Sequence, residues 1–296
     1  MKITLDPGKY RDVSPDLKGR LFAFADRAEC RELQVGPYLM QYLNLEPVES
    51  GERAQAGEPI VFFSGGAKLP VYSFAVIEAL MQCNRVIALA QPPCATLDEY
   101  FDGTDAVLRD ERIDRFHAAG SSWGGCVAQA ATLRYRDRVQ KTILSSTGLA
   151  GGKLVSFILR LHLASVRRGD PSKVVAAFRD RALALLAGDD ESGPFWRAVF
   201  DDLYDRHMTC EDYATLISTQ LDYVARYAAR VTREAWTKPV LILTTKDESA
   251  GSAGWRSALR RAYPAARFHI FETGGHHPAL LNGEEYRRVV REFLRE

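Results

Sequence analysis

The chain has 296 residues, 46% of them apolar, which is enough for one α/β domain with an insertion or for two small domains. Its 39 basic and 38 acidic residues leave a net charge of +1, which argues against nucleic acid as a partner. No run approaches the about 20 apolar residues that span a bilayer, and the N-terminus lacks a stretch of signal-peptide length, so we expect no membrane partner.

The five cysteines indicate the compartment of the protein. They are odd in number and scattered, and none forms a CxxC pair. This pattern argues against a disulfide framework or a zinc site and predicts a cytoplasmic protein without a metal. The alanine- and arginine-rich composition is typical of a GC-rich bacterial genome.

Short strands alternate with helices in the first half of the chain. The stretches 30–36 and 37–47 predict two strands that form a hairpin. The apolar runs that follow predict buried strands at 59–66, 85–93, 115–122 and 140–147, with helices at 70–82, 97–113 and 125–135.

The pattern changes between about Gly151 and Trp236, where no stretch predicts a strand. Helical periodicity there indicates helices at 153–167, 171–187, 194–207 and 211–232, before the alternation returns at 238–245, 253–263, 267–273 and 283–295. We therefore expect a mostly parallel sheet with helices on both faces, formed by residues 1–150 and 237–296, and a helical cap formed by residues 151–236.

A candidate nucleophile follows the third central strand. In parallel sheets, sites form outside the carboxyl ends of the strands. The stretch Gly120-Ser121-Ser122-Trp123-Gly124 has the G-x-S-x-G pattern of a sharp strand-to-helix turn that presents a serine. Only Ser122 has glycine two residues before and two residues after it, so Ser122 is the candidate. The alternative is a glycine-rich turn with no chemical role.

The loop after the first central strand contains Gly65-Gly66-Ala67-Lys68. In this kind of site the oxyanion is held by the N–H that follows the nucleophile, here that of Trp123, and by one N–H from this early loop. Gly66 and Ala67 are the candidates for the second donor. The alternative is an ordinary loop that begins a helix.

A serine nucleophile needs a base, and the base needs a carboxylate that orients it. Asp247 and Glu248 both follow the strand at 238–245, and position alone leaves both open. His276 comes directly after the glycine pair Gly274-Gly275 and is the candidate base, whereas its neighbour His277 is expected to pack or to face solvent. The order serine, acid, histidine is the order that this site uses.

Other histidines and aromatic residues are expected to be structural. His117 is expected in the core, and His162 and His207 are interpreted as ordinary helix residues, although either could line a pocket. Aromatic residues of the cap either form plain core or line an apolar pocket: Phe157, Phe195, Trp196, Phe200, Tyr204 and Tyr223.

The motifs SGGAK, GSSWGG, KDE and GGHHP make the sequence from about residue 30 onward resemble the α/β-hydrolase superfamily. The runs RVIALAQPP, LDEYFDG and LRRAYPAARFHIFETGGHHPALL are similar to the maspardin-like branch. That branch has aspartate at the position of Asp247, so the resemblance favours Asp247, whereas an ungapped match to other hydrolases would choose Glu248. Maspardin has asparagine at the position of His276 and is regarded as an interaction protein.

Together these patterns predict an α/β-hydrolase fold with a cap. The expected enzyme is a serine hydrolase that uses Ser122, His276 and Asp247 without a cofactor. Its substrate would be an ester, thioester, lactone or amide of a small organic molecule, and an acyl-enzyme would form. Two alternatives stay open: a cyclase, lyase or acyltransferase on the same fold, and a non-catalytic binding protein. The oligomeric state is left open.

Overall fold

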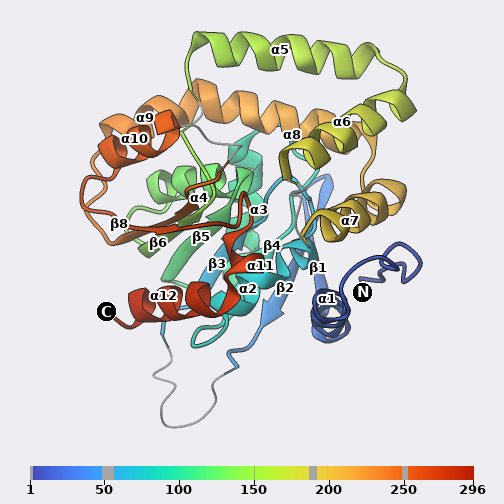
Figure 1. Ribbon diagram of the computed structural model, residues 1–296. Coiled ribbons are helices and arrows are strands. Elements are labelled where there is room, and N and C mark those ends of the chain that lie inside the picture. Colours follow the sequence, from blue (N-terminus) through green and yellow to red (C-terminus); the bar gives the residue numbers. More distant parts are fainter. Residues whose placement is uncertain (1–2, 49–56, 150, 187–191, 249–252) are drawn as a thin grey trace.

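A single eight-stranded sheet organises the computed structural model, which describes residues 3–48, 57–149, 151–186, 192–248 and 253–296 (Figure 1). The strands lie in the order β1-β2-β4-β3-β5-β6-β7-β8. Their bounds are β1 Cys30–Val35, β2 Tyr38–Leu45, β3 Ile60–Phe63, β4 Val86–Leu89, β5 Phe116–Ser121, β6 Val139–Ser145, β7 Val240–Thr245 and β8 Arg267–Phe271. The first two strands form the predicted antiparallel hairpin, β2 runs antiparallel to β4, and the other pairs are parallel.

The predicted helices are all present, with ends that differ by a few residues. They are η1 Pro70–Ser73, α2 Phe74–Leu80, α3 Leu97–Asp110, α4 Trp123–Arg134, α5 Lys153–Arg168, α6 Pro171–Leu186, α7 Ser192–Arg206, α8 Cys210–Asp222, η2 Tyr223–Tyr227, α9 Ala228–Arg233, α10 Ala253–Ala262 and α12 Gly283–Arg295. Two further helices were not predicted: α1 Pro15–Arg27 and α11 Pro278–Leu281. No described helix combines the length and the apolar character that a bilayer crossing requires.

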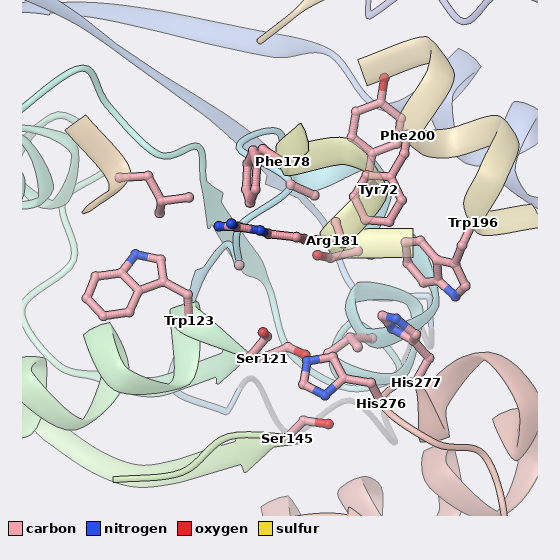
Figure 2. Close-up of a pocket in the computed structure, with 18 of the residues that line it drawn as sticks. Tyr72, Ser121, Trp123, Ser145, Phe178, Arg181, Trp196, Phe200, His276 and His277 are labelled. Atoms are coloured by element: carbon pink, nitrogen blue, oxygen red, sulfur yellow. The ribbon is translucent and has the colours of Figure 1, made fainter. Parts of the chain in front are cut away.

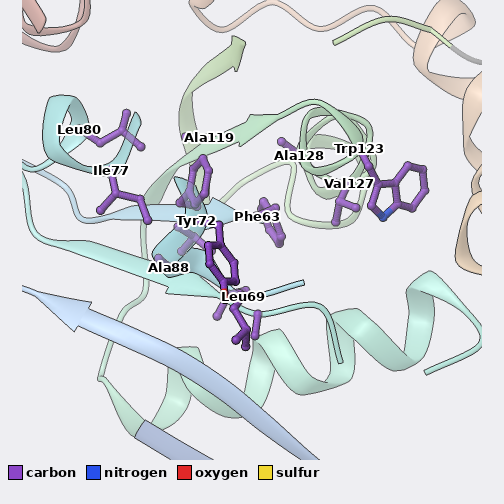
Figure 3. Close-up of a cluster of buried hydrophobic side chains, with 14 of the residues drawn as sticks. Phe63, Leu69, Tyr72, Ile77, Leu80, Ala88, Ala119, Trp123, Val127 and Ala128 are labelled. Carbon is purple, nitrogen blue, oxygen red and sulfur yellow. The ribbon is translucent and has the colours of Figure 1, made fainter. Parts of the chain in front are cut away.

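The centre of the sheet is buried on both faces. All four residues of β3 and all four of β4 are buried, which explains why these strands have continuous apolar sequences and no alternation. Figure 3 shows Phe63, Ala88 and Ala119 from three adjacent strands in one cluster with Ile77 of α2 and Val127 of α4. The core therefore fixes the ends of β3 and β5, where the predicted site begins.

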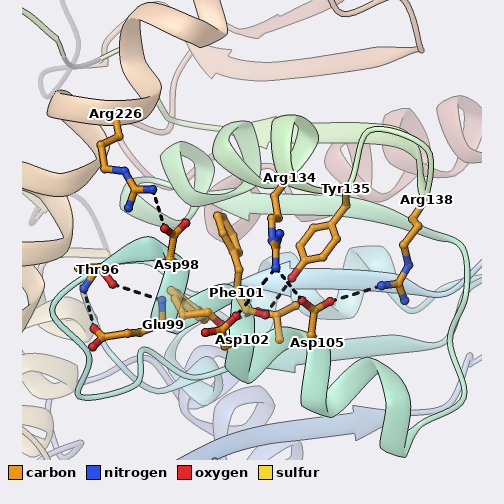
Figure 4. A network of polar contacts seen from close by, with 12 residues as sticks. Thr96, Asp98, Glu99, Phe101, Asp102, Asp105, Arg134, Tyr135, Arg138 and Arg226 are labelled. Carbon is orange, nitrogen blue, oxygen red and sulfur yellow. Dashed lines mark hydrogen bonds and ion pairs between the residues drawn. The ribbon is translucent and has the colours of Figure 1, made fainter.

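Helices α5 to α9 form an insert between β6 and β7, two strands that are direct neighbours in the sheet. Helix α3 of the sheet region contacts this insert through Asp98, which accepts hydrogen bonds from Arg226 and Tyr227 of η2. On the same helix, Asp105 pairs with Arg134 of α4 and fixes α3 to the sheet region (Figure 4). The described part of the insert is helical, as predicted.

Candidate active site

A cavity of about 440 Å³ lies where the loops after β3 and β5 meet the insert. Ser122, Trp123, Gly66, Ala67 and His276 all line it. The chain places β4 on one side of β3 and β5 on the other, so the cavity lies at the switch point where open α/β sheets bind ligands. The structure thus brings together the predicted nucleophile, oxyanion donors and base.

Ser122 occupies a sharp turn between β5 and α4. Its backbone has φ 55° and ψ −125°, a conformation that L-residues rarely adopt and that strand-to-helix turns with an exposed serine require. Two hydrogen bonds hold the turn: the Ser122 N–H donates to the Ser145 carbonyl at 3.0 Å, and the Ser122 carbonyl accepts from the Gly125 N–H at 3.0 Å. Ser121, by contrast, is the last residue of β5.

The glycines on both sides of this turn are required by close backbone contacts. A Cβ on Gly124 would lie 1.9 Å from the carbonyl oxygen of Phe63, and a Cβ on Gly120 would lie 2.1 Å from the carbonyl oxygen of Gly124. A side chain at Gly124 would therefore push helix α4 away from β3, and one at Gly120 would push β5 away from the start of α4. This is the physical reason for the pattern that singled out Ser122.

Three backbone N–H groups in the cavity wall are available for an oxyanion. Within the described part of the chain, those of Trp123, Gly66 and Ala67 donate to no protein group. The Trp123 N–H also begins helix α4, whose N-terminus favours negative charge. The Trp123 ring packs edge-on against Tyr223 of η2, with the ring centroids 5.8 Å apart, so the insert fixes this side of the cavity.

His276 is oriented by a buried carboxylate. Its Nδ1 lies 2.9 Å from Oε1 of Glu248, and the side chains of His276 and Glu248 are only 4% and 5% exposed. Because a carboxylate accepts, Nδ1 carries the proton and Nε2 keeps its lone pair. The Nε2 atom is buried and has no hydrogen-bond partner among the described residues. It is therefore available to a hydroxyl group in the cavity.

The preference for Asp247 as the partner of His276 was wrong. The exposed Asp247 carboxylate accepts hydrogen bonds from the N–H groups of Gly274 at 3.1 Å and Gly275 at 3.0 Å. Asp247 lies in the turn that follows β7, where its carboxylate faces the glycine pair, whereas the carboxylate of Glu248 faces the buried imidazole. Partial loss of water around the carboxylate raises the pKa of Asp247, but hydrogen bonds from Thr245 and from both glycines outweigh this effect and lower it.

Asp247 supports the bend of the loop that carries His276. Gly274 and Gly275 have φ values of 124° and 52°, in the region that favours glycine. The Thr245 hydroxyl donates to the Gly275 carbonyl at 2.7 Å and ties the loop to the end of β7. The bend brings His276 to the cavity, as its place after the glycine pair predicts.

His277 packs against the insert, which is one of the two outcomes expected for it. Its ring stacks on Trp196 with a centroid distance of 3.8 Å. Burial, together with the neighbouring His276, lowers the pKa of His277 well below its ordinary value. His277 is therefore a neutral wall residue of the cavity at physiological pH.

The insert supplies an apolar wall. Four of the six aromatic residues considered above line the cavity, namely Phe195, Trp196, Phe200 and Tyr204, and Figure 2 shows Trp196 and Phe200 on this side. Phe157 is 57% exposed, and Tyr223 supports Trp123 from behind. The apolar-pocket interpretation thus holds for four of these residues.

A polar cluster interrupts this wall, and the interpretation of His162 as an ordinary helix residue missed it. Nε2 of His162 lies 2.5 Å from the Tyr213 hydroxyl, and Nδ1 lies 3.2 Å from Nη1 of Arg181. All three residues line the cavity. They come from three helices of the insert, so no spacing within one helix could have revealed the cluster.

No group of three or more histidine, cysteine, aspartate or glutamate side chains that could hold a metal ion occurs among the described residues. The polar groups that line the cavity suit acyl transfer: a serine hydroxyl, an imidazole oriented by a carboxylate, and backbone N–H groups that have no acceptor among the described residues.

Comparisons with known proteins agree with this architecture. The profile of the alpha/beta hydrolase family matches residues 71–292. A 2-hydroxy-6-oxononadienedioate/2-hydroxy-6-oxononatrienedioate hydrolase of Cupriavidus pinatubonensis is 24% identical over 190 residues, which cover 64% of this chain and 65% of that one. A hydrolase of the same description from Dechloromonas aromatica is 23% identical over 184 residues, 62% of this chain and 63% of that one. The matched region is thus less than two thirds of either relative.

Solved structures share the fold at low sequence identity. An enol-lactonase from Burkholderia xenovorans superposes with a TM-score of 0.71 and 18% identity, covering 90% of this chain and 100% of that one. A thermophilic esterase from Thermogutta terrifontis gives a TM-score of 0.71 and 18% identity, covering 90% and 98%. These matches confirm the predicted α/β-hydrolase fold.

Proposed function

The chain belongs to the alpha/beta hydrolase family, and from this premise we propose that it is a serine hydrolase. Its substrates would be esters, thioesters, lactones or amides of small organic molecules. One observation carries the proposal: Glu248 fixes Nδ1 of His276, and His276, whose Nε2 has no partner among the described residues, lines the same cavity as Ser122. This is the arrangement that activates a serine hydroxyl.

The proposed reaction has two halves. The Ser122 oxygen bonds to the substrate carbonyl carbon while His276 Nε2 takes the hydroxyl proton, and the N–H groups of Trp123 and of Gly66 or Ala67 bind the developing oxyanion. The bond to the leaving group breaks, and His276 returns the proton to that group. Water then attacks the acyl-enzyme and gives a proton to His276, and His276 passes this proton to the Ser122 oxygen as the bond to the acyl group breaks and the acid leaves. Glu248 balances the imidazolium charge in both halves.

The similar proteins support an ester or lactone carbonyl as the reacting group, since structures of the same fold are described as an enol-lactonase, an esterase and an N-acyl homoserine lactone degrading enzyme. We further propose that the insert acts as a cap that selects substrates, because its aromatic residues form one wall of the cavity. The oriented histidine favours this role over a maspardin-like binding protein. A cyclase, lyase or acyltransferase would use the same residues and differ in its product.

The proposal is tested by the hydrolysis of 4-nitrophenyl butyrate. We expect Ser122→Ala to reduce kcat by several orders of magnitude, as removal of a nucleophile does in serine hydrolases. Ser121→Ala is the matched control and should keep most of the activity, because Ser121 lies on β5 outside the turn. If Ser121→Ala is the inactive variant, the assignment of the nucleophile is wrong. Full activity of Ser122→Ala would refute the proposed mechanism.

A further inference from the structure

The cavity is apolar except for a few polar groups, and one lining residue carries a permanent charge. Among the described residues that line it there is no aspartate, glutamate or lysine, and Arg181 of α6 is the single arginine. Figure 2 shows its side chain extending into the cavity, across from Ser121 and His276. The mechanism proposed above does not use this cation.

Arg181 has no carboxylate within ion-pair distance among the described residues. Its Nη1 lies 3.2 Å from Nδ1 of His162, and its guanidinium also hydrogen-bonds the Tyr213 side chain. Burial and the cation of Arg181 both lower the pKa of His162, so the contact with His162 is to a neutral ring. Arg179, two residues earlier, pairs with Asp180 and Asp201, each at 3.4 Å. Arg179 of the same helix is thus paired, whereas Arg181, which lines the cavity, has no carboxylate partner among the described residues.

The guanidinium is held in place by neighbouring rings. His162 of α5 contacts Arg181 through Nδ1 and the Tyr213 hydroxyl of α8 through Nε2. The Tyr213 ring stacks on Phe178 with a centroid distance of 3.7 Å, and Phe178 lies three residues before Arg181, on the same face of α6. Arg181 is exposed, so water solvates its guanidinium, and the surrounding rings mainly fix its direction. An anion that enters the cavity therefore meets a cation that is already oriented, which favours binding.

We propose that Arg181 binds a carboxylate of the substrate, so that the preferred substrates are esters or lactones whose acyl part ends in a carboxylate. This inference rests on the proposed function, because it names the substrate class for the same site. A guanidinium presents two parallel N–H donors, whose spacing matches the two oxygens of a carboxylate. The apolar wall accommodates the carbon chain between the carboxylate and the carbonyl that Ser122 attacks.

The test compares two esters of equal length that differ in one charge: 4-nitrophenyl hydrogen adipate and 4-nitrophenyl methyl adipate. We expect the wild-type protein to favour the charged ester in kcat/KM by roughly 3- to 10-fold, because the arginine is exposed and water screens its charge. Arg181→Met should reduce this ratio to about one, mainly by raising KM for the charged ester. Arg181→Lys should restore part of the preference. Arg179→Met, the control on the same helix, should keep the wild-type ratio.

A ratio near one in the wild-type protein, or a preference that survives in Arg181→Met, would overturn the inference while the hydrolase proposal stands. Failure of the proposed function itself looks different, since neither ester would then be hydrolysed. In that case calorimetry on the Ser122→Ala protein decides: monomethyl adipate should bind more tightly than dimethyl adipate, and adding Arg181→Met should abolish the difference. Equal binding of the two compounds would contradict the assignment of Arg181.

Discussion

At the end of β7, Glu248 lies against Nδ1 of His276, whereas its neighbour Asp247 accepts two backbone hydrogen bonds from the glycine pair. Substitutions of the two acids should therefore have different effects. Replacing Glu248 removes the charge that stabilises the imidazolium during the reaction, whereas replacing Asp247 alters the loop that carries the imidazole.

We expect Glu248→Gln to lower kcat by about 10²- to 10⁴-fold, because an amide cannot balance the imidazolium charge and disturbs the tautomer. Asp247→Asn should lower kcat by less than about 10-fold, since an amide oxygen can replace one of the two lost acceptors. It should also lower Tm, because the other glycine N–H loses its partner. Steady-state kinetics of both variants give kcat, and thermal melts give Tm. A larger kcat loss in Asp247→Asn would contradict the assignment of Glu248.

At the scale of elements, strand β5 combines a buried histidine with the serine turn at its end. His117 is in register with Ile60 of β3, and its Nδ1 is buried without a hydrogen-bond partner among the described residues. Burial, with a smaller contribution from the Lys141 cation, lowers the pKa of His117 to about 4. The folded protein thus holds this ring neutral where the unfolded chain protonates it.

The free energy of unfolding should therefore decrease as the pH is lowered. Because the pKa of His117 is about 4 in the folded state and 6.5 in a model histidine, its contribution is complete above pH 6.5 and is lost between 6.5 and 4. The slope from this one proton reaches at most about 1.4 kcal/mol per pH unit. Urea titrations at several pH values should show a shallower dependence for His117→Gln than for the wild-type protein. Parallel profiles for the two proteins would contradict a buried neutral His117.

The elements themselves were largely predictable. Buried strands such as β3 and β4 have continuous apolar sequences that end at glycine or proline, so their place was clear. Helix α1 was missed although Leu17, Leu21 and Phe24 recur at helical spacing and are buried. Helix α11 has only four residues, too few to show a period.

The site was predictable where the geometry of the turn restricts the sequence, as at Ser122 and its glycines. It was not predictable where two adjacent residues could fill the same role. Asp247 and Glu248 are adjacent in sequence, and only the direction of each side chain separates their roles. Arg181 and His162 are 19 residues apart and meet through helix packing. No sequence pattern in either helix encodes that contact.

At the scale of the whole molecule, the cavity depends on segments that are distant in sequence. Asp202 of α7 is fully buried and accepts hydrogen bonds from the hydroxyls of Tyr10 at 3.3 Å and Tyr72 at 3.4 Å. It joins the N-terminal segment, the insert and a residue of the cavity wall. Lys68, which follows the predicted oxyanion loop, pairs with Asp212 of α8 at 2.7 Å. The insert is thereby fixed to the sheet region on both sides of the site.

The central claim is that Ser122 is a nucleophile activated by His276. The most direct measurement is covalent labelling of the whole protein with a fluorophosphonate, followed by peptide mass spectrometry. We predict one adduct per chain, located on Ser122, absent in Ser122→Ala and unchanged in Ser121→Ala. An adduct on Ser121, or equal labelling of the wild-type protein and Ser122→Ala, would contradict the claim, and so would a folded wild-type protein that takes up no label.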